Sequence, residues 1–84
     1  MNLRNRPWSF NVAFSSDGNP LWQMYEELEC CMIECFYNKL RYGNKGYQQL
    51  VISNGYVVDL KYFIQIAIND PSKLRKVMRK LGPS

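Results

Sequence analysis

The sequence predicts an α+β fold in which a curled, mostly antiparallel sheet of about six strands packs its concave face on one long helix. Three observations predict it. Short apolar segments alternate with strong turn signals, one segment has apolar residues at helical spacing, and the chain has only 84 residues. At this length about 60% of the unfolded surface is buried on folding, so we expect one domain of two layers.

The first two strands are predicted from Pro7 to Phe14 and from Leu21 to Met24. In the first, every second residue is large and apolar, which is the pattern of a half-buried strand. The segment Ser15–Pro20 between them contains Asp-Gly and Asn-Pro, which are typical of turns. We therefore expect a hairpin, with Trp8 in the core and Trp22 partly in the core.

A helix is predicted from Tyr25 to Leu40 because apolar side chains recur there every three or four residues. The expected apolar face consists of Tyr25, Leu28, Met32, Cys35 and Phe36. Glu27, Glu34 and Asn38 fall on the far side, where a lone carboxylate such as Glu34 is usually solvated or paired with a basic residue. The glycines Gly43 and Gly46 follow as a loop.

The second half of the chain predicts four more strands. The segments Tyr47–Ser53 and Tyr56–Asp59 flank Asn54-Gly55, a pair typical of a type I′ hairpin turn. We expect Leu60–Phe63 to form one turn of helix. Strands at Ile64–Ile68 and Leu74–Met78 then enclose a turn at Asn69–Ser72.

The charge distribution favours an acidic partner. The net charge is +4 and the isoelectric point is near 9.1. Five cations lie between Lys73 and Lys80, whereas four of the seven acidic residues lie in the predicted helix. Nucleic acid, nucleotide polymers, phospholipid headgroups and acidic proteins all remain open from charge alone.

Gln65 is the polar residue that most needs explanation, because it stands in the run Phe63-Ile64-Gln65-Ile66-Ala67. An amide among such residues must bond to backbone, to water or to a polar ligand. Arg75 follows in the basic segment. From the residues alone, an amide that caps a sheet edge and a solvated basic edge strand are the competing interpretations.

Cysteine use and hydropathy predict a soluble intracellular domain, in nucleus or cytoplasm, that does not bind membranes. The three cysteines (Cys30, Cys31, Cys35) are an odd count and do not suggest a disulfide framework. We expect a buried free thiol, because the sequence has no histidine and too few ligands for zinc. Without histidine the sequence also lacks an evident general base, which argues against an enzyme. We expect no cofactor.

In the order of its residues along the sequence, the chain resembles the WWE domain, a module of poly(ADP-ribose) polymerases and ubiquitin ligases. Trp8, Trp22 and Glu34 match the three residues that name the family, and the resemblance implies that Glu34 and Asp59 are structural residues and not acid catalysts. Ile33-Glu34-Cys35-Phe36, Tyr56-Val57-Val58-Asp59-Leu60, Phe63-Ile64-Gln65 and the closing arginines extend the match to roughly Trp8–Lys80. We accordingly expect a single domain at 7–81 with tails at 1–6 and 82–84.

The resemblance implies a half-open barrel and non-catalytic binding of ADP-ribose or iso-ADP-ribose units of poly(ADP-ribose), in a monomer excised from a larger ADP-ribosylation or ubiquitination protein. It also implies ligand contacts by Trp22, Tyr56, Gln65 and Arg75. If the last strand forms, Arg79 shares a face with Arg75 and we expect it to assist in binding phosphate. Ser9 and Phe10 stand where some binders have a tyrosine.

Two other functions compete with this one. A protein-interaction module with a degenerate pocket would bind other protein domains. A basic binder of RNA or single-stranded nucleic acid would use the cationic strip and the tyrosines Tyr37, Tyr42, Tyr47 and Tyr62. The set Tyr56, Gln65 and Arg75 discriminates among the three.

Overall fold

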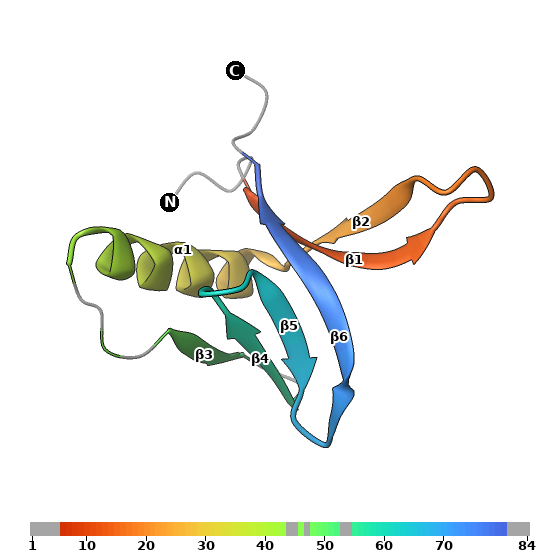
Figure 1. Cartoon of the computed structure of the whole chain (residues 1–84). Helices are drawn as coiled ribbons and strands as arrows, with labels where there is room; N and C mark the ends of the chain where they lie inside the picture. The colour runs from red at the N-terminus through yellow and green to blue at the C-terminus, as the bar shows by residue number, and fades with distance from the viewer. Residues whose placement is uncertain (1–5, 44–45, 47, 53–54, 81–84) are drawn as a thin grey trace.

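The computed structural model describes residues 6–43, 46, 48–52 and 55–80. They form one helix and a six-stranded open sheet of order β2-β1-β6-β5-β4-β3, in which every neighbouring pair is antiparallel (Figure 1). The elements are β1 (Trp8–Phe14), β2 (Pro20–Met24), α1 (Glu27–Arg41), β3 (Gln49–Ile52), β4 (Tyr56–Asp59), β5 (Ile64–Ala67) and β6 (Asp70–Arg79). The predicted α+β class is confirmed.

The predicted β1–β2 hairpin forms, with β1 beginning one residue later than predicted, at Trp8, and β2 one residue earlier, at Pro20. Its turn closes through a hydrogen bond from the Ser15 N–H to the Asn19 carbonyl at 2.8 Å. Gly18 in this turn has a φ of +87°, which a side chain would disfavour. The β1–β2 register shifts between Asn11 and Ala13, so Val12 lies at a bulge.

The helix begins at Glu27, two residues later than predicted, and with 15 residues it is not long. Tyr25 is therefore not helical, and its side chain lies in the core with 2% exposed. The first turn contains acidic residues and the last turn basic ones, an arrangement that the helix dipole favours.

The predicted apolar face of the helix is wrong for Leu28, Met32 and Cys35, whereas Phe36 packs against the core as expected. Cys30 and Ile33 are fully buried, whereas Leu28 is 73% exposed, Met32 is 38% exposed and Cys35 is exposed. The helix carries apolar residues on two opposite sides, and periodicity alone cannot tell which side meets the sheet. The predicted buried free thiol is confirmed, and it is Cys30.

The β3–β4 hairpin and β5 lie where the sequence predicts them. Gly55 has a φ of +77°, in agreement with a turn that needs positive φ, while Tyr47, Ser53 and Asn54 fall outside the described residues. The predicted turn of helix at Leu60–Phe63 is a simple turn. Asp59 stabilises this turn, because its Oδ1 accepts hydrogen bonds from the backbone N–H groups of Lys61 at 2.8 Å and Tyr62 at 3.2 Å. This is the structural role expected of Asp59.

The last strand, β6, is longer than predicted and absorbs part of the expected Asn69–Ser72 turn. Pro71 is tolerated because the β5–β6 register shifts beside it, between Ile66 and Ala67. β6 pairs with β5 over its first part and with β1 only from Val77 to Arg79. β6 thus lies between β1 and β5 in the sheet. Because β1 and β5 pair with different parts of β6, the two strands diverge from each other on either side of it (Figure 1).

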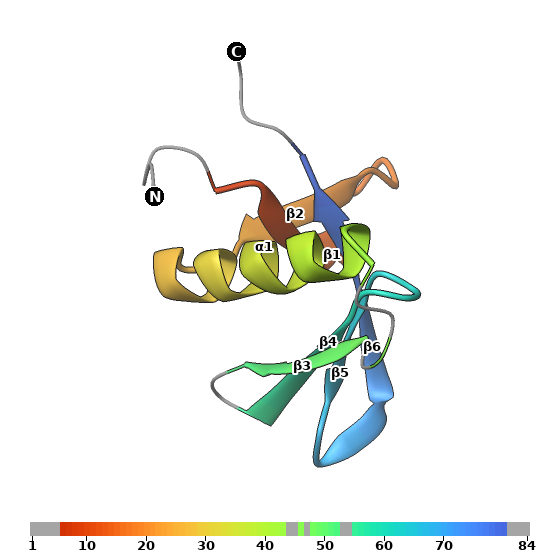
Figure 2. The same cartoon turned by 90° about the vertical axis from the view of Figure 1, so that its left-hand side faces the viewer.

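The core lies between the sheet and α1, which contacts both β1 and β3 (Figure 2). Its buried members are Trp8, Tyr25, Cys30, Ile33, Ile52, Val58, Leu60 and Val77. Trp8 is fully buried, as predicted, with the rings of Tyr37 at 5.3 Å and Phe63 at 5.6 Å. The curling of the sheet around the helix stays a prediction.

Candidate functional site

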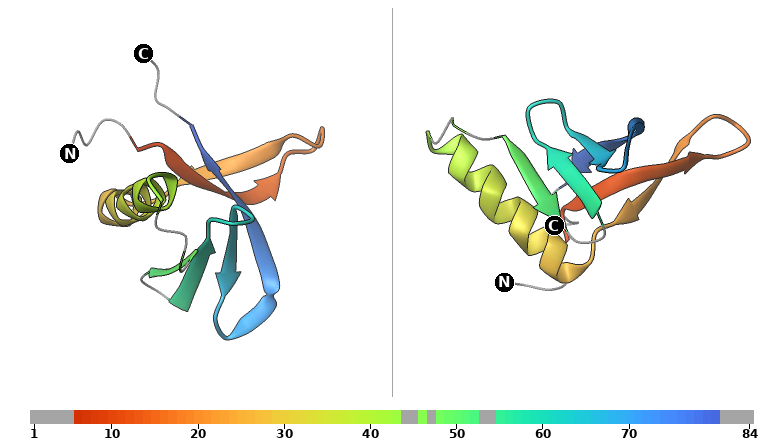
Figure 3. Two further views of the ribbon diagram at one scale, coloured as in Figure 1. Left: turned by 60° about the vertical axis from the view of Figure 1, so that its left-hand side comes forward. Right: turned by 90° about the horizontal axis from the view of Figure 1, so that it is seen from below.

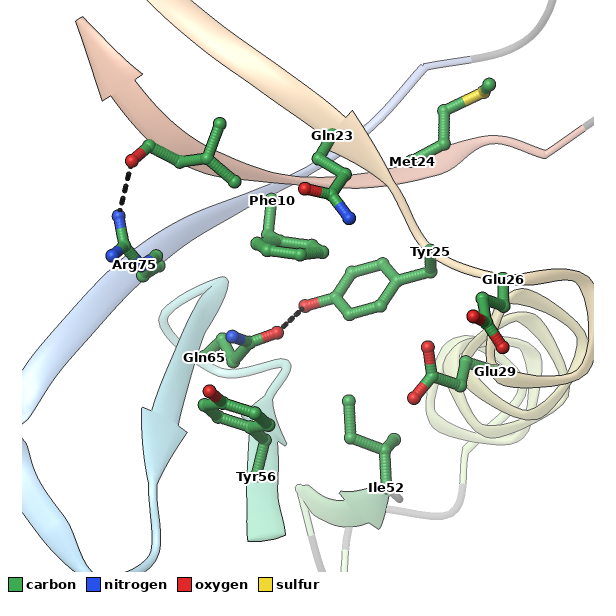
Figure 4. Close-up of a pocket in the computed structure, with 11 residues that line it drawn as sticks. Phe10, Gln23, Met24, Tyr25, Glu26, Glu29, Ile52, Tyr56, Gln65 and Arg75 are labelled. Atoms are coloured by element: carbon green, nitrogen blue, oxygen red, sulfur yellow. Dashed lines mark hydrogen bonds between the residues drawn. The ribbon is translucent and has the colours of Figure 1, made fainter. Parts of the chain in front are cut away.

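A pocket of about 300 Å³ opens where β1 and β5 separate. Residues from both halves of the sheet and from the start of α1 surround it (Figure 4). They are Phe10, Val12, Gln23, Met24, Tyr25, Glu26, Glu29, Ile52, Tyr56, Gln65 and Arg75. Three of the five predicted site residues thus line one pocket.

Gln65 is 4% exposed, and its Oε1 accepts a hydrogen bond from the Tyr25 hydroxyl at 2.6 Å. Burial raises the pKa of the Tyr25 hydroxyl, so this group remains a donor. Because Oε1 is the acceptor of the amide, the two N–H donors are on its other terminal atom. The amide therefore has a fixed orientation, set by a residue that the sequence analysis had placed in the helix.

Arg75 lies on β6 directly opposite Gln65 on β5. Its Nη1 donates to the carbonyl of Val12 at 2.8 Å and, at 3.4 Å, to that of Asn11. These carbonyls are at the β1 bulge, beyond the last residue of β1 that pairs with β6. The guanidinium thus spans the gap between the two halves of the sheet at the edge of the pocket.

Tyr56 begins β4 and is 37% exposed. Val58 and Leu60, which follow on the same side of the chain, are buried. Figure 4 shows the Tyr56 ring beside Gln65, on the side of the pocket opposite Phe10. An aromatic surface, an amide and a cation therefore come from three neighbouring strands.

Trp22 does not line this pocket. It pairs with Asn11 whereas its neighbour Gln23 pairs with Phe10, so Gln23 faces the pocket and Trp22 the opposite side of the sheet. There it borders a separate cavity of about 330 Å³ with Asn11, Phe14, Pro20, Leu74 and Lys76.

Arg79 is likewise engaged elsewhere. Its Nε and Nη2 donate to Glu34 at 3.0 Å and 2.8 Å, and its guanidinium carbon lies 4.9 Å from the centre of the Tyr37 ring. The predicted basic partner of Glu34 is thereby identified, but Glu34 points toward the sheet and not to the far side of the helix. Arg79 does not line the pocket that contains Arg75.

Glu26 and Glu29 line the pocket near the start of α1, and the sequence analysis missed them. Val12 and Gln23 were missed as well, and Phe10 was noted only as a departure from the family. The alternation along β1 and β2 contains this information, because residues of one parity share a face. Which face bears a pocket depends on the separation of β1 from β5, and no local pattern shows that.

Within the described residues, no group of three or more histidine, cysteine, aspartate or glutamate side chains is suited to hold a metal ion. The described helix is also not long and apolar enough to cross a membrane.

The chain is thus a small α+β domain with a pocket between the two halves of its sheet. The chain matches the family model of the WWE domain over residues 8–79 and belongs to that family. WWE domains are binding modules and are generally not catalytic. No curated protein and no solved structure matches the chain significantly.

Proposed function

We propose that this domain binds an ADP-ribose or iso-ADP-ribose unit of poly(ADP-ribose), or of an ADP-ribosylated protein, in the pocket at the separation of β1 and β5. The observation that carries the proposal is the convergence of Tyr56, Gln65 and Arg75 on this pocket. The domain then serves inside the cell, in nucleus or cytoplasm, as a reader within a larger ADP-ribosylation or ubiquitination protein.

Arg75 is the phosphate contact in this proposal. Both of its contacts within the described residues use Nη1, which leaves the donors on Nη2 and Nε to bind phosphate oxygens. The backbone carbonyls of β1 hold the guanidinium in place, so little side-chain entropy is lost on binding.

Gln65 and Tyr56 recognise the neutral part of the ligand. The fixed amide offers N–H donors, which suit the ring nitrogens of adenine or the oxygen atoms of ribose. The partly exposed Tyr56 ring offers a surface for stacking or apolar contact. Trp22 and Arg79 lie outside this pocket and are not part of the proposed contacts.

The carboxylates of Glu26 and Glu29 determine how the ligand is oriented in the pocket. They repel phosphate and accept hydrogen bonds from hydroxyl groups, whereas Arg75 attracts phosphate. We therefore infer that the phosphates lie beside Arg75 and that a ribose points toward the start of α1.

An amide NMR titration with ADP-ribose and iso-ADP-ribose, run in parallel, tests the proposal. We expect saturable shifts at Tyr56, Gln65 and Arg75, and the stronger binder identifies the preferred unit. Arg75→Ala and Gln65→Ala should each weaken binding at least about tenfold, because each removes a buried or charge-assisted bond. Lys73→Ala is the matched control, since it removes an exposed cation of the same strand that does not line the pocket.

The second candidate, a protein-interaction module, is favoured by one observation. Tyr25 already occupies Oε1 of Gln65 and fills part of the space inside the pocket (Figure 4). A well-dispersed spectrum without shifts for either compound would support this candidate. A nucleic-acid strip would instead show binding that falls steeply with salt and is insensitive to Gln65→Ala.

A further inference from the structure

The side of α1 that points away from the core is apolar. The outer stripe consists of Leu28, Cys31, Met32 and Cys35, in which Cys31 and Met32 lie three and four residues after Leu28 and Cys35 lies four and three residues after them. Ile33 and Cys30 occupy the opposite, buried side. A helix that is apolar on two sides is normally covered on both. Figure 3 shows α1 at the margin of the molecule, so its outer side is open for a partner.

A groove of about 300 Å³ runs along this side, between α1 and β3. Its lining residues are Cys31, Met32, Cys35, Phe36, Lys39 and Leu50. It shares no lining residue with the pocket of Gln65 and Arg75. Leu28 projects beside it with 73% of its surface exposed. The outer side of α1 therefore offers a protruding apolar side chain, Leu28, next to an apolar groove.

The charges of α1 identify the kind of partner. Beside the outer stripe, the acidic Glu27 lies in the first turn, four residues before Cys31, and the basic Lys39 lies in the last turn, four residues after Cys35. A second copy of the same helix is complementary to this pattern only when it runs antiparallel, because acid then faces base at both ends. A parallel copy would place like charges together. An antiparallel pair has the two-fold symmetry of most homodimers.

We propose that two copies of this chain associate through the outer stripe of α1, with their helices antiparallel. In this arrangement Met32 lies opposite the partner's Cys35 near the two-fold axis. Leu28 contacts the partner's groove near the partner's Lys39. Glu27, the neighbour of Leu28, lies within reach of the same lysine.

This proposal departs from the monomer expected from the sequence. That expectation assigned Leu28, Met32 and Cys35 to the core, where they would need no partner. An interface of one helix per copy is small, so the association is weak and depends on concentration.

Sedimentation equilibrium on the 84-residue chain, from about 10 µM to about 1 mM, measures this association. We expect the average mass to rise from 9.9 kDa toward twice that value. Leu28→Glu and Met32→Glu should each raise the dissociation constant at least about tenfold, because they put a charge into an apolar contact. Circular dichroism checks that the variants remain folded.

The matched control is Leu74→Glu, the same change at a leucine that is 55% exposed on β6. It should leave the dissociation constant unchanged. A wild-type mass of 9.9 kDa at every concentration would overturn the proposal. A loss of association with Leu74→Glu as large as with Leu28→Glu would do so as well.

A charge exchange distinguishes a second copy from any other partner and tests the direction of the helices. Glu27→Lys and Lys39→Glu should each weaken the dimer, and the double variant should restore it, because acid and base then simply change places. If the double variant is weaker than both single variants, the antiparallel pairing is wrong.

Discussion

Glu34 of α1 and Arg79 of β6 form a two-pronged ion pair, with Nε to Oε1 at 3.0 Å and Nη2 to Oε2 at 2.8 Å. The same Oε1 accepts the indole N–H of Trp8 at 2.8 Å. One carboxylate thus connects the helix to the first and last strands. The side chain of Trp8, a residue with no exposed surface, thereby has a hydrogen-bond partner for its only polar atom.

Replacement of this carboxylate should destabilise the fold. Glu34→Ala leaves the Trp8 N–H buried without its acceptor and Arg79 without its counter-charge. We expect a loss of about 2–3 kcal/mol in the free energy of unfolding, measured by urea denaturation. Glu27→Ala, at an exposed position of the same helix, should cost less than about 1 kcal/mol. Equal losses for the two variants would argue against a structural role for Glu34.

Acid should weaken the domain through the same group. The bonds from Arg79, and then that from Trp8, hold the pKa of Glu34 below its ordinary value of 4.5. Because the folded pKa is the lower one, this contribution is complete above pH 4.5 and is lost as the pH falls through the folded pKa. Urea denaturation across this range should show a smaller decline in Glu34→Gln than in the wild type. Parallel curves would contradict this prediction.

The hydrogen bond between Tyr25 and Gln65 should contribute to stability, since both residues are buried. Tyr25→Phe removes only the hydroxyl group and should cost about 1–2 kcal/mol. Tyr42→Phe is the control, because Tyr42 is 80% exposed, and it should change stability by less than about 0.5 kcal/mol. If Tyr25→Phe is as stable as the wild type, the bond does not hold Gln65 in place.

The two tryptophans should differ strongly in their importance for folding. Trp8 is fully buried, and Trp8→Ala should cost at least about 3–5 kcal/mol, enough to unfold a domain of this size. Trp22 is only partly buried on the outer side of β2, so Trp22→Ala should remain folded. One-dimensional proton NMR of both variants measures the outcome. A folded Trp8→Ala protein would contradict the role of Trp8 as the centre of the core.

The strands could be predicted because their signals are local. Alternation identified β1, and the turn chemistry around Gly18 and Gly55 located both hairpins. The convergence of Tyr56, Gln65 and Arg75 could be anticipated only through the ordered residues of the WWE family. Without the family, the amide of Gln65 could equally bond to backbone, to water or to a ligand, and the sequence does not distinguish these partners.

The helix shows where sequence reasoning fails. Its two apolar sides are equivalent by periodicity, and the wrong side was assigned to the core. That choice also put Glu34 on the far side and Tyr25 inside the helix. Burial of Tyr25 depends on a long-range partner, Gln65, which no local pattern contains. The error has a physical origin, because the outer side of α1 carries apolar residues such as Leu28 and Met32 although it does not face the core.

The place of β6 in the sheet has a consequence for synthesis. The β1–β2 hairpin and the strands β3, β4 and β5 are complete before β6 leaves the ribosome, yet neither group pairs with the other. Until β6 emerges, β1 and β5 each keep an open edge, and the nascent chain stays exposed to chaperones and proteases. Translation of this final strand therefore decides when the domain closes, so a ribosome that stalls before Val77 would hold an unfinished sheet.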